Sequence, residues 1–114
     1  MHEISLVQGL LAELNQLAQK HNKEKVVSVC MEIGPLSGVV IDSFQFGFDI
    51  LAKEDPLTRE ARLIIESSPA SYRCFGCGMI IKEEQRPDAC PACSETLLTP
   101  EGGDDLVLLR VEME

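Results

Sequence analysis

Four cysteines in two Cys-x-x-Cys pairs carry the clearest chemistry in this chain. Cys74 and Cys77 form the first pair, and Cys90 and Cys93 form the second. Each pair fits a zinc knuckle, a tight turn that points two sulfur atoms at one centre. Two knuckles together supply four thiolates, which is the closed tetrahedral ligand set that structural Zn²⁺ prefers. The spacing therefore predicts a structural zinc site at these four residues.

Other uses of paired cysteines fit the sequence less well. Iron in a rubredoxin-like site is the main alternative to zinc. Two redox dithiols of the thioredoxin kind would each need a strand before and a helix after, and the flanks broken by glycine and proline do not supply them. Disulfides would imply export, but the start Met1-His2-Glu3 lacks the basic and then apolar pattern of a secretory signal. We therefore expect a reducing cytoplasm and metal-bound thiolates.

The amino terminus offers a second set of donors. Met1 should be retained, because methionine aminopeptidases remove it only before small residues. The α-amine, the amide nitrogen of His2 and its imidazole can then close two fused chelate rings on one ion. Nitrogen-rich sets of this kind suit Ni²⁺ and Cu²⁺, and the carboxylate of Glu3 can add an oxygen. A histidine at position 2 is also common in proteins where it binds no metal.

The charge of the chain argues against a nucleic-acid role. The net charge is −9, from 19 acidic and 10 basic residues. Residues 72–94 hold three basic and three acidic side chains, and zinc with four thiolates adds a formal charge of about −2. A phosphate backbone is bound mainly by basic side chains, which are not in excess here. No apolar run is long enough to span a membrane, so a protein or a cation is the expected partner.

The hydrophobic periodicity predicts two helices and three strands. Apolar residues recur at helical spacing in the two helices and alternate in the strands. The predicted helices cover residues 4–20 and 41–53, and the predicted strands cover residues 25–33, 62–67 and 106–113. Between the second knuckle and the last strand we expect a short return over residues 95–99 and a loop over residues 101–104.

These elements predict an α/β (α+β) fold with two helices on a three-stranded sheet and an inserted zinc-knuckle domain. The last strand has to rejoin the first two, because an isolated hydrophobic strand would be insoluble. We expect residues 1–70 plus 100–114 to form the α/β domain and residues 71–99 to form the zinc domain, with Pro69 as a hinge. An exposed strand edge leaves both a monomer and a homodimer open.

Several residues with chemical potential have simpler structural interpretations. Cys30 lies within the first predicted strand and is expected to be a small buried hydrophobic residue. His21, at the end of the first helix, is expected to be a solvated cap. Ile41, Phe44, Phe48 and Leu51 are expected on one face of the second helix, and the phenylalanines of this helix, Phe46 included, are interpreted as helix core rather than as an aromatic ligand site.

Taken together, these motifs resemble the HypA/HybF family. The resemblance rests on Met1-His2-Glu3 opening a helix, Glu32-Ile33-Gly34 followed by Ser37, the segment Phe46-Gly47-Phe48-Asp49 and the four cysteines, and it covers the chain in order. Members of this family are nickel metallochaperones for the assembly of [NiFe]-hydrogenase. The resemblance implies nickel as transferred cargo at the Met1 amine, His2 and Glu3, with zinc at Cys74, Cys77, Cys90 and Cys93.

The resemblance also implies partners and one further ligand. The implied partners are a HypB-type GTPase and the precursor of the hydrogenase large subunit, with urease maturation proteins as additional partners in some members. Some members place an acidic residue near nickel in the loop after the Ile-Gly strand end. That position holds Val40 here, and the nearest acidic residue is Asp42, which could equally cap the second helix.

The resulting prediction is metal transfer without catalysis, because the sequence shows neither a nucleophile–base pair nor an open metal position. A zinc-ribbon regulatory or interaction module without a nickel role is the alternative.

Overall fold

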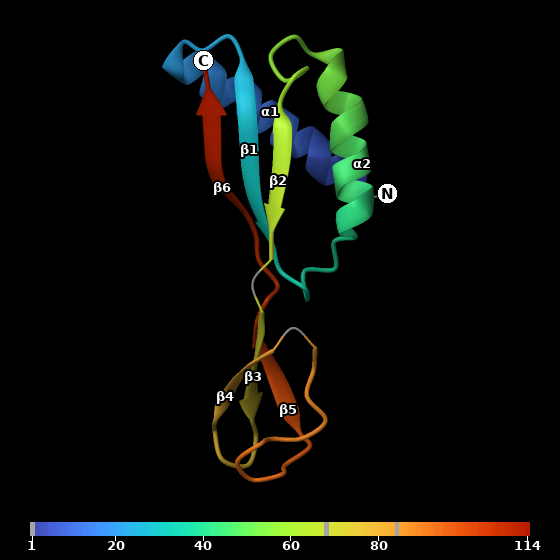
Figure 1. Cartoon of the computed structure of the whole chain (residues 1–114), viewed down its shortest axis with the longest axis vertical. Helices are drawn as coiled ribbons and strands as arrows, with labels where there is room; N and C mark the ends of the chain where they lie inside the picture. Colours follow the sequence, from blue (N-terminus) through green and yellow to red (C-terminus); the bar gives the residue numbers. More distant parts are fainter. Residues whose placement is uncertain (1, 68, 84) are drawn as a thin grey trace. The chain divides into compact units, whose positions relative to one another are not determined.

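The computed structural model describes residues 2–67, 69–83 and 85–114. Two helices and six strands follow one another, with a short 3-10 helix after the second helix (Figure 1). In chain order they are α1 (His2–His21), β1 (Val26–Ile33), α2 (Ile41–Leu51), η1 (Ala52–Glu54), β2 (Arg62–Glu66), β3 (Ala70–Cys74), β4 (Ile80–Glu83), β5 (Leu98–Gly102) and β6 (Leu106–Met113).

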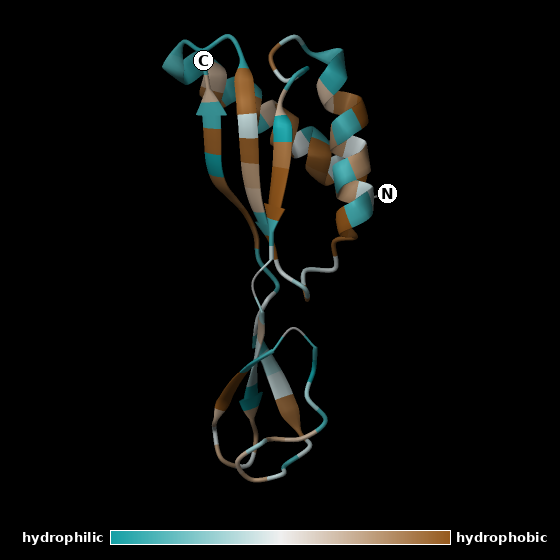
Figure 2. Cartoon of the chain, viewed as in Figure 1, coloured by the Kyte–Doolittle hydropathy of each residue, from teal (hydrophilic) through white to brown (hydrophobic). Residues whose placement is uncertain are grey.

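The first sheet has the strand order β2-β1-β6. The last strand therefore pairs with the first, which confirms the predicted three-stranded sheet and its return across the inserted segment. Figure 1 shows α1 running behind this sheet, with α2 beside β2. Both edges of β1 are thus paired. This central strand is the most buried of the sheet, and it is largely hydrophobic (Figure 2).

Local sequence explains where α1 ends. Asn22 adopts a positive φ of 55°, the left-handed conformation that asparagine tolerates after a helix. The N–H of Lys23 then donates to the Ala18 carbonyl at 2.8 Å, which satisfies one of the carbonyl groups left without a partner at the helix end. His21 is exposed at this end, as predicted.

The core of the helical part comes from one face of each helix and from β1. Val7, Leu10, Leu14 and Ala18 are buried on α1, and Phe44 and Phe48 are buried on α2. The helices approach closely at Gly47, where an added Cβ would lie 3.0 Å from Cδ1 of Ile4. Cys30 is also buried, as predicted.

One part of the prediction for α2 is wrong. Phe46 is 66% exposed and does not belong to the core. Residues 44 and 48 lie one helical turn apart on the same side, whereas residue 46 lies roughly 200° around the axis from residue 44. Ile41, also expected on the core face, is 37% exposed.

The sequence did not predict the second sheet. Strands β3, β4 and β5 form a three-stranded sheet in the order β4-β3-β5, and both pairings are antiparallel. The predicted return over residues 95–99 overlaps the start of β5, and the predicted loop over residues 101–104 begins inside β5. This segment is therefore a small β-domain with its own core.

Packing divides the chain into two compact units. Unit 1 comprises residues 1–31, 39–65 and 108–114, and unit 2 comprises residues 32–38 and 66–107. The core of unit 2 consists of Ala70, Tyr72, Cys74, Ile81, Cys90 and Leu98. Pro69, predicted as a hinge, adjoins residue 68, which lies outside the described residues.

Within unit 2, residues 34–36 lie against residues 103–105. The N–H of Gly34 donates to the Asp105 carbonyl at 2.8 Å, and the N–H of Leu36 donates to the Gly103 carbonyl at 2.6 Å. A Cβ at Gly34 would overlap the carbonyl group of Gly103. Glycine at position 34 is therefore required by the close approach of the two backbones.

Candidate metal centre

The two knuckles are held together by the second sheet. Cys74 is the last residue of β3, and its N–H donates to the Met79 carbonyl at 2.9 Å. The turn closes when the N–H of Gly78 donates to the Cys74 carbonyl at 2.9 Å, with Gly78 at a φ of 77°. Glycine adopts this left-handed conformation without strain, so the sequence Cys-Phe-Gly-Cys-Gly favours the observed turn.

The second knuckle is a turn of the same kind. The N–H of Ser94 donates to the Cys90 carbonyl at 2.9 Å, and the N–H of Cys90 donates to the Glu95 carbonyl at 2.8 Å. Ser94 has a φ of 66°, so it occupies the position that Gly78 holds in the first knuckle. The two turns therefore present their cysteines in equivalent ways.

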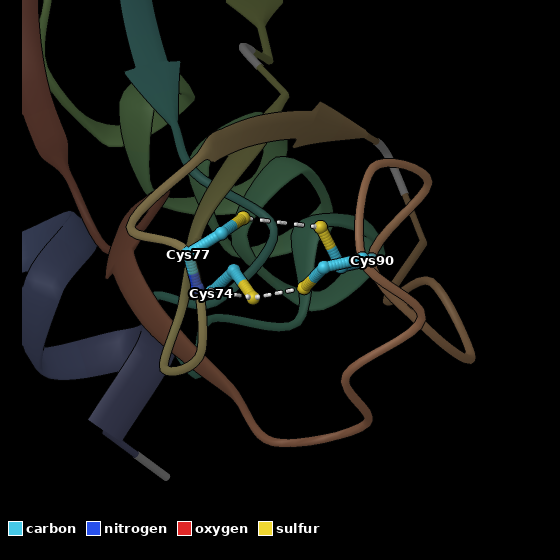
Figure 3. Close-up of side chains that lie close together, drawn as sticks. Cys74, Cys77 and Cys90 are labelled. Carbon is cyan, nitrogen blue, oxygen red and sulfur yellow. Dashed lines mark hydrogen bonds between the residues drawn. The ribbon is translucent and has the colours of Figure 1, made fainter.

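Together the turns bring all four sulfur atoms to one point. Among the described residues, the Sγ atoms of Cys74, Cys77, Cys90 and Cys93 lie within 4.8 Å of one another. The Cys74 and Cys93 sulfurs are 3.5 Å apart, and the Cys77 and Cys90 sulfurs are 3.7 Å apart. Figure 3 shows the side chains of Cys77 and Cys90 turned toward each other, with Cys74 beside them.

These distances match the size of a zinc ion. A tetrahedral centre with Zn–S bonds of about 2.3 Å places its sulfurs roughly 3.8 Å apart. Four thiolates with no open position also match the donor set of structural rather than catalytic zinc. The cluster is thus a metal-binding site consistent with structural Zn²⁺.

Burial within the cluster alternates along the chain. Cys74 and Cys90, the first cysteine of each knuckle, are buried in the core of unit 2. Cys77 and Cys93, the second of each knuckle, are exposed. Each knuckle therefore contributes one sulfur to the core and one to the surface.

The thiols affect one another electrostatically. The backbone N–H of Cys77 stabilises the Cys74 thiolate and, with help from the Cys93 thiol, lowers the pKa of Cys74 to about 7. For Cys93, the backbone N–H of Glu95 acts to lower the pKa, but the Cys74 thiol and burial outweigh it and raise the pKa to about 12. The Cys74 thiolate thus forms readily, whereas the Cys93 thiol needs a bound cation to ionise near neutral pH.

Arg86 fixes the loop between the knuckles. Its Nη2 donates to the Leu98 carbonyl at 2.6 Å, and its guanidinium lies 5.6 Å from the centre of the Tyr72 ring. No role for Arg86 was predicted from the sequence. Its contacts join residues far apart in the sequence, and no short motif signals such contacts.

The second set of donors lies at the start of α1. His2 is the first residue of the helix, and its Nδ1 lies 3.5 Å from Glu3 Oε2. The backbone N–H of Val40, directly before α2, also donates to Glu3 Oε2, at 3.2 Å. This hydrogen bond is the main reason that the pKa of Glu3 is lowered, although burial opposes it and the charge of His2 adds to it.

Met1 and Asp42 are the other two predicted nickel ligands. Met1 lies outside the described residues. Asp42 stands in the first turn of α2 and is exposed. The N-cap residue of α2 is Val40, so Asp42 is not the helix cap that was the alternative to a ligand role, although its negative charge suits the start of a helix.

Comparison with known proteins decides the family. A protein-family model described as "Hydrogenase/urease nickel incorporation, metallochaperone, hypA" matches residues 1–113. The chain belongs to this HypA family. It is 39% identical to the hydrogenase maturation factor HypA of Alkalilimnicola ehrlichii and 36% identical to that of Azotobacter chroococcum, and each alignment covers 100% of both chains.

Solved structures agree with the family assignment. The solution structure of the Ni metallochaperone HypA from Helicobacter pylori is similar, with a TM-score of 0.67, 26% identity and coverage of 97% of this chain and 96% of that one. A second solution structure of a HypA protein gives a TM-score of 0.72 at 26% identity, covering 100% of this chain and 97% of that one. The chain is thus a nickel metallochaperone of the hydrogenase maturation machinery, as the resemblance implied.

Neither described helix is long and apolar enough to cross a membrane.

Proposed function

We propose that this HypA-family chain binds Ni²⁺ at its first three residues and transfers it to the large-subunit precursor of [NiFe]-hydrogenase. The ligands would be the Met1 amine, the amide nitrogen and imidazole of His2, and the carboxylate of Glu3. The observation that carries this proposal is the pair formed by His2 and Glu3, whose Nδ1 and Oε2 atoms lie 3.5 Å apart at the start of α1.

The position of His2 in the helix supports an amide ligand. The first four N–H groups of an α-helix have no intrahelical acceptor, and His2 is the first residue of α1. Its amide nitrogen can therefore lose its proton and bind a metal without breaking a helical hydrogen bond. The His2 side chain is 62% exposed, which leaves the imidazole accessible for loading and release.

Glu3 and Val40 connect this site to the loop before α2. The resemblance placed an acidic ligand at the position of Val40, and the backbone of Val40 is bound to the carboxylate of Glu3. In this chain Glu3 would supply the carboxylate oxygen that the acidic residue of this loop provides in some other family members. Asp42, two residues further on, remains the candidate for an additional ligand.

Nickel titration of purified protein tests the amino-terminal site. We expect wild type and His21→Ala to bind one ion, while His2→Ala and a form extended ahead of Met1 bind at least tenfold more weakly, because each loses donors. His21→Ala is the matched control, because it removes the other histidine of α1. Undiminished binding by the His2 variant and the extended form would remove the amino terminus from the mechanism.

The role of Asp42 can be separated from general charge effects. Asp42 and Asp49 are the two acidic residues of α2. If Asp42 binds nickel, Asp42→Asn weakens binding and Asp49→Asn does not. Equal behaviour of the two variants would eliminate Asp42 as a ligand.

The second metal would have a structural role. Zn²⁺ held by Cys74, Cys77, Cys90 and Cys93 would keep unit 2 folded, because two of the four sulfurs belong to its core. We expect Cys74→Ala to lose zinc and the order of residues 71–99, leaving α1, α2 and their sheet folded. Cys30→Ala, which removes a buried cysteine outside the cluster, should retain one zinc per chain as measured by elemental analysis. A full zinc complement in Cys74→Ala would contradict this assignment.

We therefore assign nickel binding to a domain of residues 1–70 plus 100–114 and zinc binding to a domain of residues 71–99. The protein would act in the cytoplasm without catalysing a reaction, because its task is to hold and release an ion. A HypB-type GTPase would be a partner in loading, and urease maturation proteins are further candidates. The net charge of −9 predicts no salt-dependent binding to duplex DNA.

A further inference from the structure

The second sheet has one covered face and one open face. Along β3, alternate residues point to opposite sides, and Tyr72 and Cys74 are buried together with their partners Ile81 and Leu98. Arg73 points the other way and pairs with Ile80 on β4 and Thr99 on β5. All three of these residues are exposed.

The open face continues beside the first knuckle. The N–H of Phe75 donates to the Leu97 carbonyl at 3.1 Å, which extends the pairing of β3 with β5 by one residue on each strand. Phe75 is 74% exposed and Leu97 is 53% exposed. We name Phe75, Ile80 and Leu97 the knuckle face.

The knuckle face is a cluster rather than three separate exposed residues. Its members come from three neighbouring chain segments of one sheet, and Met79, next to Ile80, is 41% exposed as well. Single exposed apolar side chains are ordinary, whereas clustered ones mark surfaces that bind another molecule. The sequence adds to this pattern, because residues 74–81 contain no charged side chain.

A fixed carboxylate borders the cluster. Glu95 Oε1 accepts hydrogen bonds from the N–H groups of Thr96 and Leu97 at 2.9 and 3.1 Å. A Cβ at Gly76 would lie 3.5 Å from Glu95 Oε2, so the carboxylate stands between the knuckle and Leu97. The two backbone N–H groups hold this carboxylate in position, so no second side chain is needed to orient it.

The surrounding charge favours a basic ligand. Residues 66–107 contain eight acidic and three basic residues, and Arg73 is already paired with Glu101, with Nε 2.7 Å from Oε1. A second copy of this chain would bring a like-charged surface against the same face, which is unfavourable. Basic side chains flanking a large apolar one would complement it.

We propose that the knuckle face is a docking surface for a segment of a partner protein that carries large apolar side chains next to lysine or arginine. The apolar side chains would cover Phe75 and Leu97, and a basic group would pair with Glu95. The knuckle face contains no residue of the amino-terminal nickel site, so docking and nickel binding can be tested independently.

A synthetic peptide provides the test. The probe is a short fluorescent peptide in which lysine and leucine alternate, added to the zinc-loaded full chain. Matched peptides replace leucine with serine or lysine with glutamate. We expect the lysine–leucine peptide to bind at least tenfold more tightly than either matched peptide, as measured by fluorescence anisotropy, and to shift the backbone amide NMR signals of residues 75, 80 and 97.

Variants assign the binding to this face. Phe75→Ser and Leu97→Ser should each weaken binding about tenfold, the loss typical of a central contact residue. Glu95→Gln should weaken it while leaving the apolar side chains in place. The matched control is Phe46→Ser, which removes the exposed phenylalanine of α2 and should bind as wild type does. One zinc per chain confirms that each variant keeps its metal site.

Three results would overturn the proposal. The first is equally tight binding of the lysine–serine and lysine–leucine peptides, which would show that net charge alone accounts for binding. The second is a set of amide shifts centred outside residues 73–80 and 95–99. The third is self-association of the chain that disappears in Phe75→Ser, which would make a second copy the occupant.

Discussion

The backbone N–H of Val40 donates a hydrogen bond to Glu3 Oε2 at 3.2 Å. Val40 is the N-cap residue of α2, and its own side chain has no atom that can accept a hydrogen bond. The carboxylate at the start of α1 thus interacts with the positive end of α2. The same oxygen lies 3.5 Å from His2 Nδ1, so the first turn of α1 is positioned by the start of α2.

This contact predicts a dependence of stability on pH. The pKa of Glu3 is lowered in the folded protein, first by the Val40 hydrogen bond. Its contribution to folding is therefore present above the pKa of the unfolded state and is lost as the pH falls through the folded-state value. Urea unfolding at a series of pH values from neutral to acid should show a smaller acid loss of stability in Glu3→Gln than in wild type. Glu13→Gln, at an exposed position of the same helix, should behave as wild type, and identical curves for the Glu3 variant would contradict the prediction.

Zinc binding by the metal-free protein should release protons. At neutral pH the Cys74 thiol, with its pKa of about 7, is partly ionised, whereas the Cys93 thiol, with its pKa raised to about 12, is protonated. The pKa of the Cys77 thiol is raised as well: the backbone N–H of Met79 acts to lower it, but burial and the Cys74 and Cys90 thiols outweigh this effect. Because only thiolates bind the ion, roughly two or more protons should leave per zinc, and the logarithm of the affinity should rise by about two or more per pH unit. Calorimetry in buffers of different ionisation enthalpy measures this number. A release of one proton or none would argue against a four-thiolate site.

Two glycine substitutions should act in opposite directions. Gly34→Ala would force a Cβ into the Gly103 carbonyl group and should destabilise the protein by about 1–3 kcal/mol. Gly9→Ala places a Cβ on α1 where no atom lies within 4 Å, and should stabilise it by about 0.5–1 kcal/mol through helix propensity. Thermal unfolding of both variants checks the pair. A Gly34 variant as stable as wild type would rule out the close backbone approach.

Arg86 should control how long the zinc is retained. Its contacts with the Leu98 carbonyl and the Tyr72 ring hold the loop between the knuckles. Losing about 1 kcal/mol of such contacts should speed zinc transfer to a chelator roughly fivefold in Arg86→Ala. Lys82→Ala, which removes an exposed basic residue of β4, provides the control. Equal rates in the two variants would show that Arg86 has no part in retaining the metal.

The periodic and motif-bearing parts of the chain were predictable. The last strand, β6, has the predicted bounds of residues 106–113, because a mainly apolar run follows the predicted loop that contains Gly102 and Gly103. The cysteine spacing predicted the cluster, since two knuckles encode their geometry within a few residues. The predicted first helix began at residue 4, whereas α1 begins at His2. The polar side chains of His2 and Glu3 add nothing to the apolar periodicity from which the start was predicted.

The second sheet was not predictable in the same way. Strands β3, β4 and β5 have four or five residues each, too few for alternation to stand out among turn residues and a proline. Their stability depends on the pairing of residues 70–74 with residues 98–102, which is not visible locally. Phe46 was interpreted as core by its residue type, although the helical period already places it away from the face that Phe44 and Phe48 share.

The sheet order β2-β1-β6 has a consequence for biosynthesis. Strands β3 to β5 adjoin one another in the chain, so the pairings of their sheet need no residue beyond Gly102. The outer edge of β1, by contrast, has to wait for residues 106–113 to be synthesised. A nascent chain stalled before that point exposes an unpaired hydrophobic strand that a chaperone or a neighbouring polypeptide can capture.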